Sequence, residues 1–178
     1  AQQSARGPAC ADLVAASGVA RVVVGCADPD PRTAGAGLAR IRSAGIAADL
    51  VPSPGCAEGL AGYLSLRGRG RPLVTLKLAL SLDGCIATAS GESQWITGPE
   101  ARAHCHAIRA RHDAILVGGG TLRADAPRLD VRLPGLEARS PARWVLTHGH
   151  APAGWQALVA PEAISAMADT QTLFVEGG

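Results

Sequence analysis

A run of apolar residues ends in three consecutive glycines near the middle of the chain, in the stretch A-I-L-V-G-G-G-T at residues 114–121. A strand that runs into glycines lets backbone amides approach a ligand closely and point at its phosphate groups. The spacing differs from that of the G-x-G-x-x-G fingerprint and from that of the P-loop. A tight structural turn would explain the three glycines equally well, so both interpretations stay open from the residues alone.

Arginines lie on both sides of these glycines in the sequence. Arg109 precedes them, and Arg123, Asp125, Arg128 and Arg132 follow. Guanidinium groups bind phosphate through paired hydrogen bonds, so these side chains would make one side of a pocket suited to a phosphate. A set of surface arginines without a ligand is the alternative.

Three further residues have types that are suited to a binding pocket. Lys77 lies in the middle of an apolar strand, where a lysine costs free energy unless it reaches a partner or solvent. A lysine that faces water from an edge strand is the alternative to a functional one. Ser93 and Trp95 are two residues apart, and in an extended segment they would place a hydroxyl and an indole on one side of a pocket. Packing alone would also explain the tryptophan.

The residues by themselves do not predict a metal site. His104 and His106 are two apart on an expected helix and therefore point about 200° apart, so they cannot share one ion. The five cysteines are odd in number, widely spaced and without a C-x-x-C pair, which supports neither a disulfide framework nor a zinc knuckle. This cysteine pattern fits a reducing cytosol and predicts a cytoplasmic protein.

The composition bounds the classes of function. With 178 residues, 47% of them hydrophobic and 18% charged, the chain can bury a core in one or two small domains. The net charge of +2 is spread along the chain, so no nucleic-acid partner is expected, whereas small acidic ligands are. We find no apolar run of membrane-spanning length and no secretory signal, so no membrane partner is expected. The chain lacks an initiator methionine and stops after an apolar run, so we expect both ends to be truncated.

The elements that must position these residues follow an α/β order. In the first part of the chain we expect helices at residues 12–17, 38–44 and 57–66 and strands at 19–25 and 46–51. The order strand, helix, strand predicts a parallel pair. The basic, glycine-broken segment 67–72 then reads as a linker, with a solvated surface as one interpretation of its arginines and a phosphate contact as the other.

The second part repeats the alternation of strands and helices. Strands are expected at residues 73–80, 114–117, 144–147 and 172–175, and a helix around 161–167. Thr97 followed by Glu100 has the pattern of a capping box and predicts a helix that runs to about Ala110. Gly118 to Gly120 is expected to be a tight turn, with Thr121 opening another helical turn. The domain boundaries are therefore 1–66, 67–72 and 73–178.

Three ordered motifs resemble a known family. They are L-K-L-A-L-S-L-D-G-C-I-A-T-A-S-G-E-S-Q-W-I-T-G-P-E-A-R at residues 76–102, A-I-L-V-G-G-G-T-L-R-A-D-A-P-R-L-D-V-R at 114–132, and V-E-G-G at 175–178. Together they are similar to the reductase domain of the bifunctional riboflavin-biosynthesis deaminase/reductase. The front of the chain, with R-G-P-A-C-A-D-L-V at 6–14 and D-P-D-P-R-T-A-G-A-G at 28–37, resembles the end of the deaminase domain of the same family.

The resemblance implies a fold, a reaction and a set of site residues. It implies the C-terminal remnant of a cytidine-deaminase-like domain followed by a dihydrofolate-reductase-like domain that is incomplete at its end. The reductase would use NADPH to reduce the ribose of 5-amino-6-(5-phosphoribosylamino)uracil to a ribityl chain. By motif, Lys77 would be catalytic and reach the ribose. The implied cofactor-binding residues are Ala79, Trp95, Thr121, Asp125 and Gly178. The implied substrate-binding residues are Ser93, Arg109, Leu129, Arg132 and Glu176.

The deaminase part departs from its family pattern. Zinc deaminases need an H-x-E segment and a cysteine pair, and only Cys10 matches a ligand position here. The resemblance therefore implies zinc only in a full-length parent, which is expected to be a homo-oligomer, and a buried thiol is the alternative for Cys10. Two other functions stay open. One is a stand-alone reductase for a different pterin- or pyrimidine-like substrate, and the other is an inactive NADPH-binding or interaction module.

Overall fold

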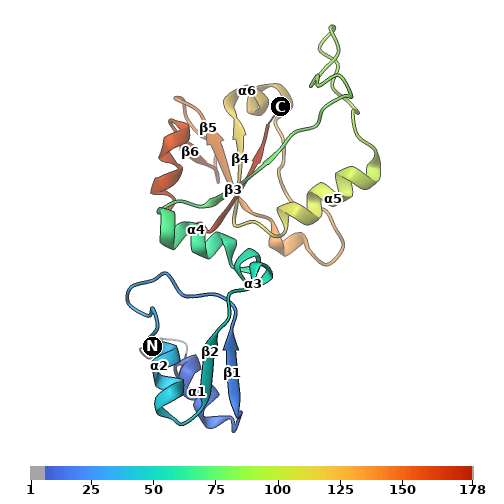
Figure 1. Cartoon of the computed structure of the whole chain (residues 1–178). Coiled ribbons are helices and arrows are strands. Elements are labelled where there is room, and N and C mark those ends of the chain that lie inside the picture. The colour runs from blue at the N-terminus through green and yellow to red at the C-terminus, as the bar shows by residue number, and fades with distance from the viewer. Residues whose placement is uncertain (1–6, 178) are drawn as a thin grey trace. The chain divides into compact units, whose positions relative to one another are not determined.

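The computed structural model describes residues 7–177 and divides the chain into two compact units, Ala1–Gly70 and Arg71–Gly178. The first unit contains a short parallel strand pair (Figure 1). Its helices and strands are α1 (Cys10–Ala16), β1 (Arg21–Val24), α2 (Ala36–Ser43), β2 (Ala47–Leu50), α3 (Pro54–Gly59) and α4 (Ala61–Arg69). Ala11 from α1, Ile41 from α2 and Ala48 from β2 form its small core. The predicted parallel pairing is confirmed.

The helix expected at residues 57–66 is two helices in the structure. Pro54 opens α3 three residues early, since proline is suited to the first helical turn. The chain then breaks at Leu60, directly after Gly59, and α4 continues through Arg67 and Arg69. The end of α4 is set by Gly70 at φ 67°. The irregular segment between helix and next strand is therefore shorter than the expected linker.

The second unit is built on a five-stranded sheet in which every neighbouring pair is parallel, in the order β3-β7-β4-β5-β6. Its elements are β3 (Leu73–Lys77), α5 (Pro99–Arg109), β4 (Ala114–Gly118), α6 (Gly119–Asp125), η1 (Glu137–Arg139), β5 (Ala142–Leu146), β6 (Gln156–Leu158), η2 (Pro161–Ala166) and β7 (Thr172–Glu176). Within residues 7–177, no helix is both long enough and apolar enough to cross a membrane.

The two faces of this sheet are covered by different elements. Ile115 and Val117 point to the side of α5, where they pack with Phe174 against Cys105 and Ile108. The alternate residues of β4, Ala114 and Leu116, pack on the other side against the η2 segment. This is why β4 is buried on both faces and is a continuous apolar run in the sequence.

The structure corrects three predictions about the elements of the second unit. The strand expected at 73–80 ends at Lys77, because its only neighbour β7 ends beside it and the Gly177 amide makes the last bond to the Lys77 carbonyl at 3.1 Å. Strand β6 was not predicted, since three residues carry too short a pattern. The helix around 161–167 is a 3₁₀ segment.

Two predicted local motifs are also wrong. Helix α5 begins at Pro99 with Gly98 as its N-cap, and no side-chain cap bond is present, so Thr97 and Glu100 do not form a capping box. Proline at the first helical position supplies the helix start instead. The three glycines do not form a tight turn, because Gly118 caps α6 at φ −71° and Gly119 and Gly120 are its first residues.

The start of α5 gives a test of this correction. Thr97→Ala should change the free energy of unfolding by less than about 0.5 kcal/mol, whereas loss of a true threonine cap costs about 1 kcal/mol. Asp113→Ala is the contrasting variant, because its carboxylate accepts from the Gln171 and Thr172 amides at 2.9 Å, and it should cost about 1 kcal/mol or more. Urea unfolding followed by tryptophan fluorescence measures both, since all three tryptophans lie in the second unit. A loss near 1 kcal/mol for Thr97→Ala would restore the capping box.

Candidate active site

The carboxyl ends of the parallel strands gather the site residues at one edge of the sheet. Lys77 ends β3, Gly118 ends β4 and Glu176 ends β7, and α6 follows directly from β4 at this edge (Figure 1). Ligands of open parallel sheets bind at this edge, because the loops that follow the strands leave a crevice there. Lys77 and Glu176 are partners in the β3–β7 register, so the catalytic and substrate-binding candidates are neighbours.

A buried ion pair joins helix α5 to the end of β7. Arg109 Nε donates to Glu176 Oε1 at 2.6 Å, and Nη2 donates to Oε2 at 2.9 Å. Both side chains are only 12% exposed. Two parallel bonds between a planar guanidinium and a carboxylate fix both partners in distance and orientation. The structure thus brings together two of the predicted substrate residues and pairs them with each other.

The charge states of this pair are set by opposing effects. Burial alone raises the pKa of Glu176, but the hydrogen bonds and charge of Arg109, with a smaller contribution from Lys77, bring that pKa below its ordinary value. Burial likewise lowers the pKa of Arg109, and Glu176 outweighs it, so the pKa of Arg109 is raised. Glu176 therefore remains a carboxylate and is not suited to be a proton donor at neutral pH.

Asp130 is the point on which three arginines converge. Arg109 Nη1 donates to its carbonyl oxygen at 3.0 Å, while its carboxylate is paired with Arg128 at 2.5 Å and Arg132 at 2.6 Å. Leu129, just before it, has a left-handed backbone at φ 53° and a fully buried side chain. The loop that carries the predicted substrate residues Leu129 and Arg132 is thereby attached to the buried Arg109–Glu176 pair.

The sequence did not predict Cys105, His106 or Asp130 as part of this cluster. Cys105 Sγ lies 3.6 Å from Glu176 Oε1, and burial followed by the charge of Glu176 raises the pKa of the thiol, which keeps it protonated. His106 Nδ1 lies 3.1 Å from the Asp130 carbonyl oxygen and 3.3 Å from the Arg132 amide nitrogen. The three-residue spacing of His106 and Arg109 on one helix face was the available signal.

The glycine segment leaves backbone open at the end of β4. A Cβ on Gly118 or Gly120 would meet nothing within 4 Å, whereas one on Gly119 would lie 3.3 Å from the Leu146 carbonyl oxygen. Gly119 therefore has a packing role, and the other two glycines have none in the described residues. An approaching phosphate would meet bare backbone there. Thr121 is half-buried and Asp125 exposed on α6, the helix that follows.

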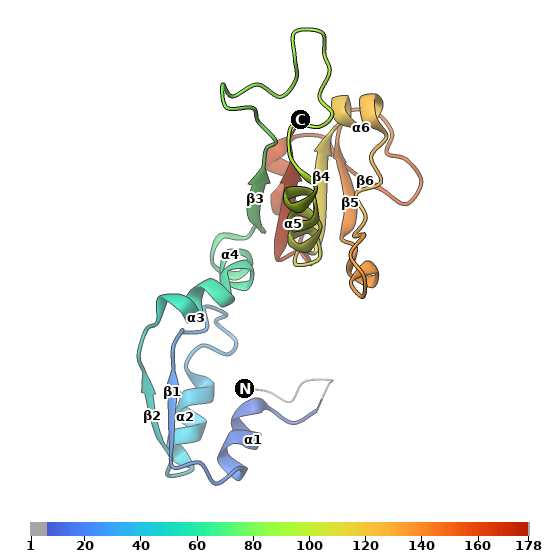
Figure 2. The same ribbon diagram turned by 90° about the vertical axis from the view of Figure 1, so that its right-hand side faces the viewer.

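Ala79, Ser93 and Trp95 lie in residues 78–98, which contain neither helix nor strand. Both views show this segment projecting beyond the carboxyl edge of the sheet (Figure 2). Trp95 is 70% exposed and its ring lies 4.3 Å from the Arg102 guanidinium carbon, and Ser93 is exposed. The structure therefore does not bring Ser93 or Trp95 into contact with the Arg109–Glu176 pair.

Two predicted residues have no site in the described part of the chain. Gly178 lies outside the described residues. Cys10 is exposed at the start of α1, and residues 7–177 contain no group of three His, Cys, Asp or Glu side chains that could hold a metal ion. The described residues therefore do not fit a zinc site, and the alternative of a buried thiol at Cys10 is also wrong.

Because the pair is buried, removal of either Arg109 or Glu176 alone should strongly lower the free energy of unfolding. Glu176→Gln leaves the Arg109 charge buried without a counter-ion and should cost about 3–5 kcal/mol of unfolding free energy. The matched control is Asp49→Asn, which breaks the exposed Arg21–Asp49 pair and should cost under about 1 kcal/mol. Circular dichroism during urea unfolding measures both units. The double variant Arg109→Met, Glu176→Met should lose less unfolding free energy than the sum of the losses in Arg109→Met and Glu176→Met. A loss equal to that sum would contradict the coupling.

The depressed pKa of Glu176 also predicts a pH dependence. Its contribution to stability is complete above its unfolded pKa of about 4.3 and is lost as the pH falls through the lower, folded value. The difference in unfolding free energy between the unaltered chain and Glu176→Gln should therefore shrink below about pH 4. Urea unfolding over a pH series measures it, and a constant difference would show that Glu176 is not held ionised by Arg109.

Comparison with solved structures finds the same fold over nearly the whole chain. A deaminase/reductase from Thermotoga maritima superposes with a TM-score of 0.85 at 28% identity, covering 99% of this chain and 59% of that one. RibD from Acinetobacter baumannii superposes with a TM-score of 0.84 at 30% identity, with coverage of 99% and 60%. The α/β fold with a parallel sheet is thus that of the RibD reductase domain.

Comparison of sequences finds curated relatives that are named riboflavin biosynthesis protein RibD. RibD of Escherichia coli is 46% identical over 138 residues, which is 77% of this chain, and RibD of Chlamydia trachomatis is 46% identical over 144 residues, which is 79%. The chain spans about two fifths of the length of these relatives, 38% in each case. Residues 72–175 match the model of the RibD C-terminal domain, and the chain belongs to that family.

Proposed function

We propose that this chain catalyses the NADPH-dependent reduction of the ribose of 5-amino-6-(5-phosphoribosylamino)uracil, as the reductase part of a longer deaminase/reductase. The observation that carries the proposal is the placement of Lys77 beside the buried Arg109–Glu176 pair, in a member of the RibD C-terminal domain family. A charged donor next to a fixed carboxylate–guanidinium pair is suited to orienting a sugar and polarising one of its groups.

NADPH, when bound, supplies the hydride that is transferred to C1 of the ring-opened ribose. The residues present fit such a cofactor, because Gly118 and Gly120 expose backbone that no side chain covers. We assign cofactor binding to Ala79, Trp95, Thr121 and Asp125, with Gly178 as a further proposal by motif. Trp95 would have to approach the edge of the sheet from its projecting segment, because it is 70% exposed.

Lys77 is proposed to polarise the group that accepts the hydride. Its strand neighbour Glu176 is already bound to Arg109 by two hydrogen bonds, so Lys77 is not neutralised by a direct ion pair within residues 7–177. The three charges of Lys77, Arg109 and Glu176 leave the site with one net positive charge. As a hydride adds to C1, negative charge develops on the atom that is double-bonded to C1, and a positive group beside that atom would stabilise the charge.

The proposed substrate residues have different amounts of hydrogen-bonding capacity left. Arg109 already donates from Nε, Nη1 and Nη2 to Glu176 and Asp130, so its main role is to position the site. Arg132 uses one nitrogen on Asp130 and is 50% exposed, which leaves most of its donors for a phosphate. Leu129 would contribute backbone, and Ser93 a hydroxyl from the projecting segment.

The first unit is proposed to be the end of the deaminase domain of the same parent. The superposition on the Thermotoga maritima deaminase/reductase supports this, because it covers 99% of the chain and so includes the first unit. Cys10 would then be one zinc ligand of the parent. Because the described residues do not fit zinc, we propose no deaminase step for this chain.

The reductase proposal is tested by turnover. The purified chain should lose NADPH absorbance when it is given the deaminated pyrimidine substrate, and Lys77→Ala should lower the rate by about 100-fold or more. Arg111→Ala is the matched control, because Arg111 is an exposed basic residue outside the cluster and should leave the rate unchanged. Binding of NADPH without turnover by the unaltered chain would favour the inactive NADPH-binding module. Equal rates for Lys77→Ala and the unaltered chain would remove the role of Lys77.

A further inference from the structure

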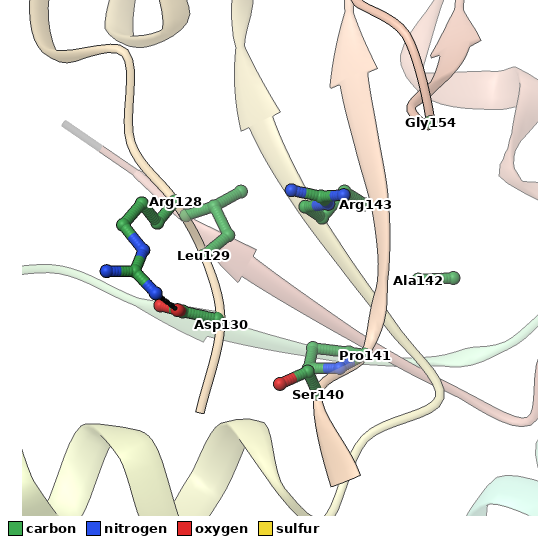
Figure 3. A pocket seen from close by; sticks show the side chains of 8 residues that line it. All are labelled: Arg128, Leu129, Asp130, Ser140, Pro141, Ala142, Arg143 and Gly154. Atoms are coloured by element: carbon green, nitrogen blue, oxygen red, sulfur yellow. Dashed lines mark hydrogen bonds and ion pairs between the residues drawn. The ribbon is translucent and has the colours of Figure 1, made fainter. Parts of the chain in front are cut away.

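A cavity of about 510 Å³ lies beside the first residues of β5 (Figure 3), whereas Lys77 is the last residue of β3. Its walls come from three segments that are distant in sequence, the loop with Arg128 and Asp130, the start of β5 with Arg143, and the turn at Gly154. None of the proposed cofactor residues lines it. Two guanidinium groups and one carboxylate are the charged groups in its walls.

Arg143 is a half-buried cation that has an aromatic neighbour but no anionic one in the described residues. Within residues 7–177 its guanidinium makes no ion pair and no hydrogen bond, and its carbon lies 5.5 Å from the centre of the Trp155 ring. Gly154, at φ 75°, leaves room beside it, since a Cβ there would lie 3.5 Å from Arg143 Nη2. The ring lies within the range of a cation–π attraction, and the five N–H donors of the guanidinium stay available.

The wall formed by the loop adds positive charge. The Asp130 carboxylate is shared between Arg128 and Arg132, so one negative charge faces two positive ones and the group keeps a net charge of +1. Burial raises the pKa of Asp130, but the charges of Arg132 and Arg128 bring it below its ordinary value, so the carboxylate stays ionised. With Arg143, the charged groups in and beside the cavity sum to +2.

We propose that this cavity is an anion-binding site for a phosphate monoester, with Arg128 and Arg143 as its ligands. A phosphate dianion matches the charge of +2 and can accept several N–H bonds from planar guanidinium groups, which a carboxylate matches less well. The phosphate is either that of the proposed phosphoribosyl substrate, in which case the assignment rests on the proposed function, or that of a separate small phosphate ester. Arg109 links this site to Glu176, because it donates to the Asp130 carbonyl oxygen.

The binding test uses inorganic phosphate and ribose 5-phosphate as probes, with ribose as the uncharged control, in isothermal titration calorimetry of the full chain. Both phosphates should bind and ribose should not. Arg143→Ala and Arg128→Ala should each weaken phosphate binding about tenfold or more, as expected for the loss of one charge-assisted contact. The phosphate affinity of Arg143→Lys should lie between that of the unaltered chain and that of Arg143→Ala, because lysine keeps the charge and lacks the planar guanidinium group.

The matched control is Arg111→Ala, which removes an exposed arginine outside the cavity and should bind phosphate like the unaltered chain. Tryptophan fluorescence during urea unfolding checks that each variant folds. Phosphate affinity that is equal in folded Arg143→Ala or Arg143→Lys and in the unaltered chain would overturn the proposal.

Steady-state kinetics with NADPH then separates the two sources of the phosphate. A raised KM for the pyrimidine substrate in Arg143→Ala, with the KM for NADPH unchanged, assigns the cavity to the substrate phosphate. An unchanged substrate KM together with weakened phosphate binding assigns it to a separate ester, and both results support the site. Absence of turnover in the unaltered chain would count against the proposed function only, because the calorimetry needs no reaction.

Discussion

The arrangement of the second unit depends on the buried contact between Arg109 and Glu176. The two residues are 67 positions apart and come from α5 and β7, and their paired bonds of 2.6 and 2.9 Å fix the helix against the end of β7. Lys77 is set beside this pair by strand register, and the loop around Asp130 is held by the third nitrogen of Arg109. One guanidinium group therefore determines the relative positions of the end of β7, helix α5 and the loop around Asp130.

A buried ion pair is a costly way to join two elements, since desolvation of both charges offsets most of their attraction. Apolar side chains of the same size would hold α5 on the sheet as well, as Ile108 and Phe174 already do. The pair adds direction, because a bidentate contact allows one geometry where apolar packing allows many. The neighbouring groups are held uncharged mainly by burial: burial and then the charge of Glu176 raise the pKa of Cys105, and burial with Arg109 and Arg132 lowers that of His106. The cluster thus presents fixed charge without a reactive thiol.

The elements that depend on a local sequence pattern could be predicted. The limits of elements that depend on a neighbouring strand or on a tertiary contact could not. The apolar run at 114–117 could be identified as a buried strand because both faces of β4 are covered. The end of β3 could not be predicted, since it depends on where β7 stops. Thr97 matched a capping box locally, yet Pro99 set the helix start. For the site, residue types and motif named Arg109 and Glu176 separately as ligand contacts. Their pairing with each other is a tertiary contact between residues 67 positions apart, and a sequence pattern does not predict such a contact.

The arginines cannot be told apart by residue type, but they differ in how many N–H donors remain available to a ligand. Arg109 donates from all three of its nitrogens, Arg128 and Arg132 share one carboxylate, and Arg143, which sequence analysis did not select, makes no ion pair and no hydrogen bond within residues 7–177. Positive charge therefore increases from the strand edge, where Glu176 neutralises Arg109, toward the cavity beside β5. The proposed hydride transfer needs precise placement and modest charge, whereas the proposed phosphate ligand needs excess positive charge. The graded engagement of the arginines would supply both environments, with Asp130 as the residue that contacts arginines of each.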